Sequence, residues 1–427
     1  MKKSLPRLRG HAAGAPIIPE GTDLVAGSVA ALKKLDGSYM LIQGPPGAGK
    51  TYTSSHAIVA LLRDGKRIGV ASHSHKAINN LLKDVETLAQ EQGVRFRGIK
   101  KSSIEEQFFE GRQIGDTLDN EAATKGGHQL IAGTAWLFAR LDLDQALDYL
   151  FIDEAGQVSL ANVLAMGVCA RNVVLVGDQM QLSQPIQGAH PGGSGISGLD
   201  HLLGGMATVP LDRGIFLAVT WRMHPDICRF ISDAVYDSRL KSDQSTLQQR
   251  IDVAGMGDPA LAPTGIRFVA VEHSGHAQKS PPEAERLKQA FAAALGKEWI
   301  NQHGERKTIG LNDILVVSPY NMQVNHLRDI LPEGARVGTV DKFQGQEAAV
   351  VLISMTTSSG DDMPRNIEFL YSRNRLNVAI SRARCLSVVF ASPRLLEIPC
   401  NTIEQMQLVN TLCWVKDYAE VSCVQIV

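Results

Sequence analysis

The fold of this chain is decided by residues 39–51, YMLIQGPPGAGKT, in which an apolar run leads directly into a glycine-rich loop. The loop at 44–51 matches the pattern GxxxxGK[ST], and the residues that follow have the spacing of a helix. Strand, loop and helix in this order bind phosphate, because backbone N–H groups of the loop and helix start face the anion. The alternative is an ordinary glycine-rich turn, which the flanking elements disfavour. The sequence therefore predicts a P-loop nucleotide site.

The residues of this loop have separate expected tasks. Gly44, Gly47 and Gly49 let the backbone wrap a phosphate without side chains in the way. The ammonium group of Lys50 places its positive charge beside the β- and γ-phosphates. Thr51 offers its hydroxyl to Mg²⁺. We therefore expect a nucleotide bound together with magnesium.

Polar residues follow two further apolar runs. In YLFIDEA (149–155), Asp153 would hold the Mg²⁺ shell and Glu154 would activate the attacking water, which indicates a hydrolase. An acidic pair at a strand end can also be a plain helix N-cap, and the P-loop upstream favours the catalytic interpretation. In VVLVGDQMQL (173–182), Gln181 is expected to sense the γ-phosphate.

Short apolar runs alternate with helix-like segments over most of the chain, a pattern typical of parallel sheets covered by helices. A first series of strands is expected at 39–43, 67–72, 129–133, 149–152 and 172–176, with helices at 51–63 and 77–90. A second series is expected at 216–220, 266–271, 313–318, 336–340, 350–355 and 386–391, with a helix at 282–302. The pattern predicts an α/β protein with two domains.

Glycine-rich sequence separates the two series. Glycines from 188 to 205, followed by Pro210, place the domain boundary near 205–213. We expect an N-terminal extension at 1–37 and domains at 38–205 and 214–427. Residues 83–128 interrupt the first series with mixed charges, and we expect them to form a small surface insertion.

Composition limits the classes of protein that remain. The 427 residues are 44% hydrophobic and 20% charged, which is typical of a soluble globular chain. No apolar run approaches the roughly 20 residues needed to span a bilayer, so we expect no membrane contact. Six cysteines without a paired spacing favour a reducing compartment, and we expect the protein in the cytoplasm. The net charge of −1 gives no hint of a nucleic-acid partner.

Nine short motifs follow one another in an order that resembles the superfamily 1 helicases. They are GPPGAGKT (44–51), SHSHKAINNLL (72–82), IAGTA (131–135), FIDEAGQ (151–157), GDQMQLSQP (177–185), TWRMHP (220–225), VVSPYNMQ (316–323), VGTVDKFQGQE (337–347) and RLNVAISRAR (375–384). The resemblance is to the 1B branch, which includes the nonsense-mediated-decay RNA helicase and the nuclease-helicase of Okazaki-fragment processing. SHKA (74–77) with DEAGQVSLAN (153–162) is also similar to bacterial proteins that fuse a RecB-type nuclease to such a helicase.

The resemblance implies two RecA-like P-loop domains with ATP and Mg²⁺ bound in the cleft between them. It implies that Arg222 and Arg382 reach the γ-phosphate as arginine fingers. It further implies that Trp221 stacks on the base and that Glu347 holds the ribose. Two cations that act only when the domains close would make closure a condition of hydrolysis.

Single-stranded DNA or RNA is the partner that the resemblance implies. Short polar side chains and one aromatic ring at strand ends would contact it, namely Ser74, His75, Thr134, Pro319, Tyr320 and Thr339. The alternative for each is a plain turn or edge residue. The family has an Asn where His75 stands here.

Two departures from the family accompany these motifs. Residues 1–42 contain no Gln that could recognise the adenine edge, so we expect weak selectivity for the base. The small barrel that precedes the P-loop in this branch has no room, so we expect either loss of accessory parts or a fragment of a longer chain. A nuclease domain ahead of this chain, or a separate nuclease partner, is expected with it.

The motifs predict an ATP-dependent helicase or translocase, and the resemblance to the 1B branch implies movement from 5′ to 3′. Two alternatives stay open. A P-loop ATPase that remodels a protein partner would hydrolyse ATP without regard to nucleic acid. A non-enzymatic binding module would not need Lys50, Asp153 and Glu154.

Overall fold

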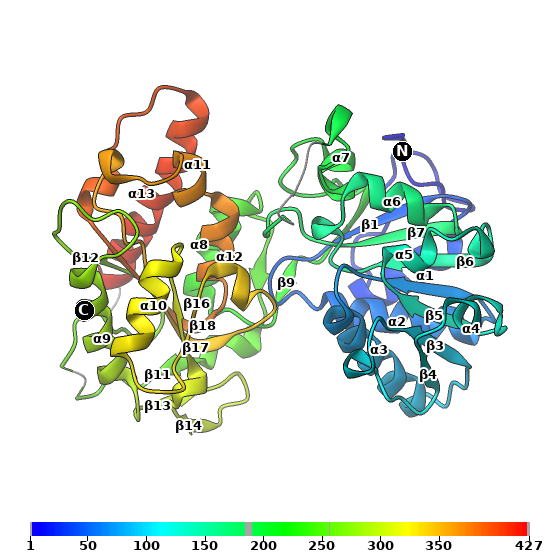
Figure 1. Cartoon of the computed structure of the whole chain (residues 1–427), viewed down its shortest axis with the longest axis horizontal. Coiled ribbons are helices and arrows are strands. Elements are labelled where there is room, and N and C mark those ends of the chain that lie inside the picture. Colours follow the sequence, from blue (N-terminus) through cyan, green and yellow to red (C-terminus); the bar gives the residue numbers. More distant parts are fainter. Residues whose placement is uncertain (1, 184–189, 256, 425–427) are drawn as a thin grey trace. The chain divides into compact units, whose positions relative to one another are not determined.

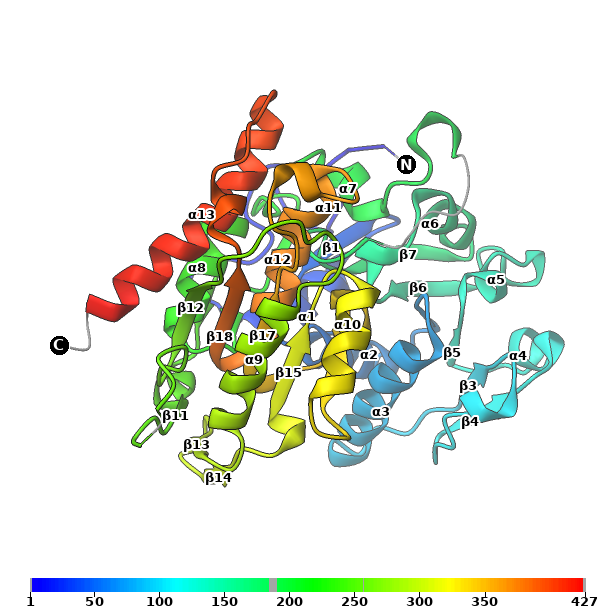
Figure 2. The same ribbon diagram turned by 60° about the vertical axis from the view of Figure 1, so that its left-hand side comes forward.

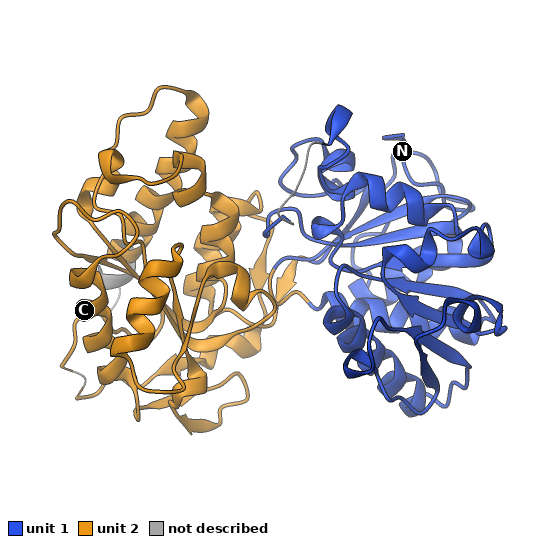
Figure 3. Ribbon diagram, in the orientation of Figure 1, with its two compact units in different colours: residues 1–45, 49–217 blue, residues 46–48, 218–427 orange. Residues whose placement is uncertain are grey.

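The structure is a computed structural model that describes residues 2–183, 190–255 and 257–424 (Figure 1). Residues 184 and 185 of the expected motif at 177–185, and the expected linker glycine Gly188, lie outside the described residues. The chain forms two compact units, Met1–Pro45 with Gly49–Leu217 and Pro46–Ala48 with Ala218–Val427 (Figure 3). Each unit has its own parallel sheet, so the predicted α/β class is confirmed.

The first unit is built on an eight-stranded sheet whose neighbouring strands are all parallel, in the order β4-β3-β5-β2-β6-β7-β1-β8. The strands are Tyr39–Gln43 (β1), Ile68–Ala71 (β2), Gly98–Lys101 (β3), Ile114–Thr117 (β4), Leu130–Gly133 (β5), Leu147–Ile152 (β6), Ala170–Gly177 (β7) and Gly214–Phe216 (β8). Every residue of β2 and β5 is buried, which explains why these segments are continuous apolar runs.

Helices cover this sheet in two groups, in which α2 packs against α1 and α3, and α6 packs against α5 and α7. The helices are Leu24–Lys34 (α1), Lys50–Arg63 (α2), His75–Glu91 (α3), Asn120–Lys125 (α4), Ala135–Phe138 (α5), Leu160–Gly167 (α6) and Gly198–Leu203 (α7). The short helix α5 directly follows β5 (Figure 2). It contacts both β5 and β2.

The second unit has a five-stranded parallel sheet in the order β12-β18-β17-β15-β16. These strands are Gly265–Ala270 (β12), Ile314–Val317 (β15), Arg336–Gly338 (β16), Ala348–Ser354 (β17) and Ala383–Ala391 (β18). Two small sheets accompany it, made by Val219–Thr220 (β9) with Lys241–Ser242 (β10), and by Arg250–Ile251 (β11), Glu298–Ile300 (β13) and Arg306–Thr308 (β14).

Helices again lie in two groups, α9 with α10, and α8 with α12 and α13. They are Pro225–Val235 (α8), Pro281–Ala294 (α9), Asn321–Ile330 (α10), Ile367–Leu370 (α11), Arg373–Ile380 (α12) and Ile403–Val424 (α13). The apolar side chains of α9, such as Leu287 and Phe291, are buried in one core with those of β15, β17 and β18.

Three expected elements differ from the structure. The expected strand 216–220 is divided, because Phe216 ends β8 beside β1 while Val219 starts β9 in the other unit. The expected helix at 282–302 ends at Ala294, since Gly296 has a left-handed backbone (φ 79°) and β13 follows. Residues 83–128 are not a separate surface insertion, because β3 and β4 extend the main sheet through β5.

The first unit reaches Leu217, beyond the expected limit of residue 205, since β8 pairs with β1. Residues 214–217 therefore belong to the first unit, because β8 pairs with the interior strand β1. The glycines that precede this segment do not mark the boundary between the units. Within the described residues, no helix is both long and apolar enough to cross a membrane.

Candidate nucleotide and nucleic-acid sites

The P-loop has the left-handed backbone that its glycines allow. Gly47 and Gly49 have φ of 72° and 77°, and Gly49 directly precedes α2. A Cβ atom on Gly44 would lie 2.2 Å from Cγ of Lys50, so the closed form of the loop requires glycine there. The Lys50 Nζ donates a hydrogen bond of 2.7 Å to the Gly44 carbonyl oxygen, which keeps the ammonium inside the loop.

The tip of the loop, Pro46–Ala48, belongs to the second unit. The Thr220 Oγ1 donates to the Pro46 carbonyl oxygen at 2.9 Å, and the Trp221 N–H donates to the Gly47 carbonyl oxygen at 3.0 Å. A Cβ atom on Gly47 would lie 2.6 Å from Cβ of Arg222. The motif TWRMHP therefore packs on the loop tip, and a larger residue at 47 would force the two apart.

The acidic pair lies at the carboxyl end of β6. Burial raises the pKa of Asp153, and the charge of neighbouring Glu154 raises it further. A buried carboxyl group of this kind gains from a cation beside it. Oxygen atoms of one carboxylate and the Thr51 hydroxyl are donors that suit Mg²⁺, which usually takes few protein ligands and completes its shell with water and phosphate. The donor set therefore fits magnesium.

Glu154 itself has a left-handed backbone (φ 52°), which is uncommon for a residue that is not glycine. Such strain is concentrated at functional sites. Gln181, after β7, is buried, and its Nε2 donates to Oδ2 of Asp178 at 2.9 Å. Its side chain is therefore oriented by a neighbour at the same strand end.

In the second unit, Glu347 lies between two arginines. Its Oε2 accepts from Nε of Arg222 at 2.5 Å, and its Oε1 pairs with Arg384. Burial alone would raise the pKa of Glu347, but the two guanidinium groups lower it to about 2. Both carboxylate oxygens are engaged in this arrangement, so the ribose contact expected of Glu347 would have to compete with them. Arg384 is a site residue that the motif alone did not single out, although it stands two positions after Arg382.

The expected arginine finger Arg382 is only 2% exposed. Its Nε donates to the Val378 carbonyl oxygen at 3.0 Å, and its Nη1 donates to the Gln346 carbonyl oxygen at 3.2 Å. The Trp221 side chain is 54% exposed, so the indole is accessible to a ligand.

The other residues expected at the two sites of the first unit lie just after the carboxyl ends of its strands. In the first sheet, Ala71 of β2 is level with Gly133 of β5 and with Ile152 of β6. Ser74 and His75 after β2, Thr134 after β5 and Asp153 after β6 therefore leave the same edge of one sheet. The P-loop and Gln181 leave that edge too, because Gln43 of β1 is level with Gly177 of β7.

Ser74 is the N-cap of α3, and its Oγ accepts from the Ala77 N–H at 3.2 Å. Thr134 is the N-cap of α5 but makes no side-chain cap bond. The His75 Nδ1 is buried and has no hydrogen-bond partner within the described residues. Burial lowers the pKa of His75, and the charges of Lys100 and Lys101 lower it further. The part of the sheet edge formed by the ends of β2 and β3 is therefore electropositive.

In the second unit, Val317 of β15 is level with Gly338 of β16, so Pro319 and Thr339 follow at one edge of the sheet. Both are partly exposed. Tyr320 corrects our expectation, because its ring is buried (5% exposed) against Phe369, and the Thr357 hydroxyl donates to its oxygen at 3.3 Å. In this arrangement the ring offers no face to a nucleobase.

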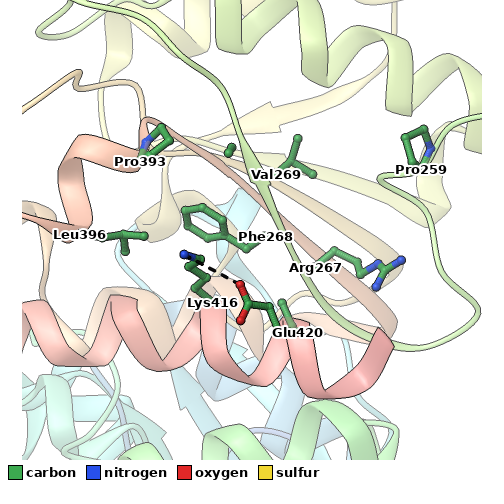
Figure 4. A pocket seen from close by; sticks show the side chains of 10 residues that line it. Pro259, Arg267, Phe268, Val269, Pro393, Leu396, Lys416 and Glu420 are labelled. Atoms are coloured by element: carbon green, nitrogen blue, oxygen red, sulfur yellow. Dashed lines mark ion pairs between the residues drawn. The ribbon is translucent and has the colours of Figure 1, made fainter. Parts of the chain in front are cut away.

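A pocket of the second unit lies between the edge strand β12 and α13 (Figure 4). Its lining residues are Pro259, Arg267, Phe268, Val269, Ala270, Pro393, Leu396, Lys416, Ala419 and Glu420. No expected site residue is among them, so this pocket is separate from the candidate sites. Within the described residues, no group of three or more His, Cys, Asp and Glu could hold a metal ion.

The fold and these residues define a P-loop nucleoside triphosphatase with two α/β units. Two family models, each described as an AAA domain, match residues 26–191 and 207–394. The chain belongs to superfamily 1B of the helicases, and the resemblance given by the motifs is thereby confirmed.

Three relatives illustrate this membership. "DNA polymerase alpha-associated DNA helicase A" of Schizosaccharomyces pombe is 27% identical over 405 residues, covering 81% of this chain and 59% of that protein. "DNA replication ATP-dependent helicase/nuclease JHS1" of Arabidopsis thaliana is 26% identical, with 84% and 27% covered. "Regulator of nonsense transcripts 1 homolog" of Arabidopsis thaliana is 25% identical, with 90% and 33% covered. The chain spans less than two thirds of the length of each.

Proposed function

We propose that this chain is an ATP-driven helicase or translocase that moves along single-stranded DNA or RNA in the 5′ to 3′ direction. The observation that supports this most is the common edge of the first sheet. Nucleotide residues leave it after β1, β6 and β7, and polar residues suited to a nucleic-acid backbone leave it after β2 and β5. One rigid sheet would thus link the two ligands.

The hydrolysis step follows from the chain's own groups. Lys50 and the backbone of the loop would hold the phosphates. Thr51 and Asp153 would hold Mg²⁺, which would supply positive charge against the phosphates. Glu154 accepts a proton from the attacking water, and Gln181 orients the γ-phosphate. We assign Arg222 to stabilising the negative charge that develops in the transition state. Arg382 can join it only if its guanidinium leaves the carbonyl oxygens of Val378 and Gln346, against which it is buried in this structure.

Glu347 gives Arg222 an alternative partner in the absence of nucleotide, since both groups are partly shielded from water in their ion pair. The ion pair orients the guanidinium of Arg222 without fixing it permanently. A bound γ-phosphate would compete with Glu347 for this guanidinium. Trp221, with its accessible indole, would stack on the base.

On the second unit, Pro319 and Thr339 follow adjacent strands at the carboxyl edge, whereas Glu347 and Arg382 stand at the start of β17 and β18. We assign the first edge to nucleic acid and the second to nucleotide. This separation would let one unit respond to both ligands at once.

Stimulated hydrolysis tests the proposal. We expect ATP turnover to rise when poly(dT) or poly(U) is added, and the binding to weaken steeply between about 50 and about 200 mM salt through counterion release. Turnover that does not change with either polymer at low salt would contradict the proposal. It would favour a P-loop ATPase that remodels a protein partner.

Some relatives are named as combined helicases and nucleases. A nuclease encoded with this chain or acting beside it stays a proposal. Mixing the chain with a labelled oligonucleotide, Mg²⁺ and ATP would detect cleavage by the chain itself.

A further inference from the structure

We propose that Trp136 is a stacking platform for a base of the single strand, and that Lys76 and Lys101 contact the phosphates beside it. This inference rests on the proposed function and extends it. None of these three residues belongs to the contacts assigned above.

The first observation is the exposure of Trp136. Its side chain is 86% exposed, although the next two residues of α5, Leu137 and Phe138, are buried. The helix therefore keeps its place through those two side chains and leaves the indole in water. Tryptophan is highly buried on average, and Trp299 of this chain is 3% exposed. A large ring that is left this exposed suits a ligand that has a flat face of its own.

The second observation is the position of Trp136 in the sheet. Gly133, the last residue of β5, is level with Ala71 of β2, and Ala132 is level with Lys100 of β3. Neighbouring strands lie about 4.8 Å apart, so the three strand ends form a short row. Trp136 stands two residues after Thr134 in the middle of that row. His75 follows the strand on one side, and Lys101 ends the strand on the other.

The third observation is the charge along the row. Lys76 is exposed and Lys101 is partly exposed, and neither has an acidic partner within 4.0 Å among the described residues. Lys100 beside them is fully buried, and its ammonium donates to the Ser102 Oγ at 2.8 Å and to the Gln107 carbonyl oxygen. Asp116, on the next strand, is occupied by the N–H groups of Phe109 and Glu110. Positive charge therefore stays available at this edge.

These observations favour nucleic acid over an apolar protein surface. An isolated indole flanked by cations matches the alternation of flat base and phosphate in a single strand. The platform is tolerant of sequence, because every base has a π-face. Strands β3 and β4 would then have a function in binding. They lie outside the family motifs, and they lengthen the row of strand ends next to β5.

The experiment compares Trp136→Ala, Trp136→Phe and Leu141→Ala. Leu141 is the matched control, because it is 91% exposed, apolar and only five residues away. Binding of fluorescent oligo(dT) is measured by anisotropy, and the thermal midpoint of each variant shows that it is folded. We expect Trp136→Ala to bind about tenfold more weakly, Trp136→Phe to retain most of the affinity, and Leu141→Ala to bind like the wild type.

The variant Lys101→Ala adds a second measurement, the salt dependence of binding. This quantity would not change if Lys101 had only a structural role. If Lys101 contacts a phosphate, the slope of log Kd against log salt falls by about one. Wild-type affinity in Trp136→Ala, with the wild-type chain binding oligo(dT), would overturn the inference and leave the proposed function intact. A wild-type chain that binds no nucleic acid would instead remove the proposed function itself.

Discussion

Glu154 is the residue whose chemistry the proposed hydrolysis depends on most. Its strained backbone and its place beside a buried Asp153 fit a group that is held for catalysis rather than for packing. The motif FIDEAGQ predicted the residue, but no sequence pattern gives its left-handed backbone.

We expect Glu154→Gln to bind ATP with near wild-type affinity and to hydrolyse it at least about a hundredfold more slowly, because the base is lost and the phosphate cradle stays. Lys50→Ala should instead lose nucleotide affinity. Equilibrium binding of a fluorescent ATP analogue and single-turnover hydrolysis separate the two effects. Near wild-type turnover in Glu154→Gln would show that another group activates the water.

Glu347 connects the stability of the second unit with pH. Its pKa in the folded chain is about 2, below the value of about 4.3 in an unfolded chain. The stabilisation that Arg222 and Arg384 provide is therefore complete above about pH 4.3 and is lost as the pH falls toward 2.

We expect the unfolding temperature of the wild type to fall more steeply between about pH 4.3 and about pH 2 than that of Glu347→Gln, which has no carboxylate to protonate. Differential scanning calorimetry over this range gives both curves. Asp226, whose pKa is also lowered to about 2, is present in both proteins and cancels in the comparison. Parallel curves would mean that the ion pairs add nothing to stability.

At the scale of elements, α9 is held to the end of β17 by one buried carboxylate. Glu283 is fully buried, and its oxygens accept from the Ser354 Oγ at 2.6 Å and the Thr356 N–H at 2.7 Å, with His273 Nε2 at 2.9 Å. Thr356 has a left-handed backbone (φ 75°), which is strained for a β-branched residue. The carboxylate therefore also fixes the loop that follows β17.

We expect Glu283→Ala to lower the free energy of unfolding by about 3–5 kcal/mol, because the buried Ser354 hydroxyl and Thr356 N–H lose their acceptor and His273 loses its partner. Glu285→Ala is the control on the same helix, since that side chain is 59% exposed and its ion pair with Lys288 is long, at 3.9 Å. Urea denaturation followed by circular dichroism measures both variants. A similar, small effect of the two substitutions would contradict the role given to Glu283.

The elements that sequence predicted well are the buried parallel strands. Residues 39–43 form β1 as expected, and the expected strand at 149–152 lies within β6, because a long apolar run before a polar turn has few other structures open to it. Strands β3 and β4 were missed, since GIKK and IGDT are short and polar and become strands only by pairing at the sheet edge. Tyr320 was misjudged for a similar reason, because burial against Phe369 depends on a residue distant in the sequence.

Each unit combines one large parallel sheet with helices in two groups, and most candidate residues lie at strand ends or at the start of the helix that follows. Ligands of open α/β sheets commonly bind at such ends. The matched regions cover 81%, 84% and 90% of this chain, and less than two thirds of each of the three relatives.

If ATP hydrolysis moves this chain along a single strand, as we propose, the chain should displace streptavidin from biotinylated oligonucleotides. With ATP, the wild type should displace streptavidin from the 3′ end much faster than from the 5′ end, whereas Glu154→Gln should displace it from neither. Faster displacement from the 5′ end would reverse the direction. No ATP-dependent displacement from either end, in a chain that hydrolyses ATP, would contradict the claim that hydrolysis drives movement.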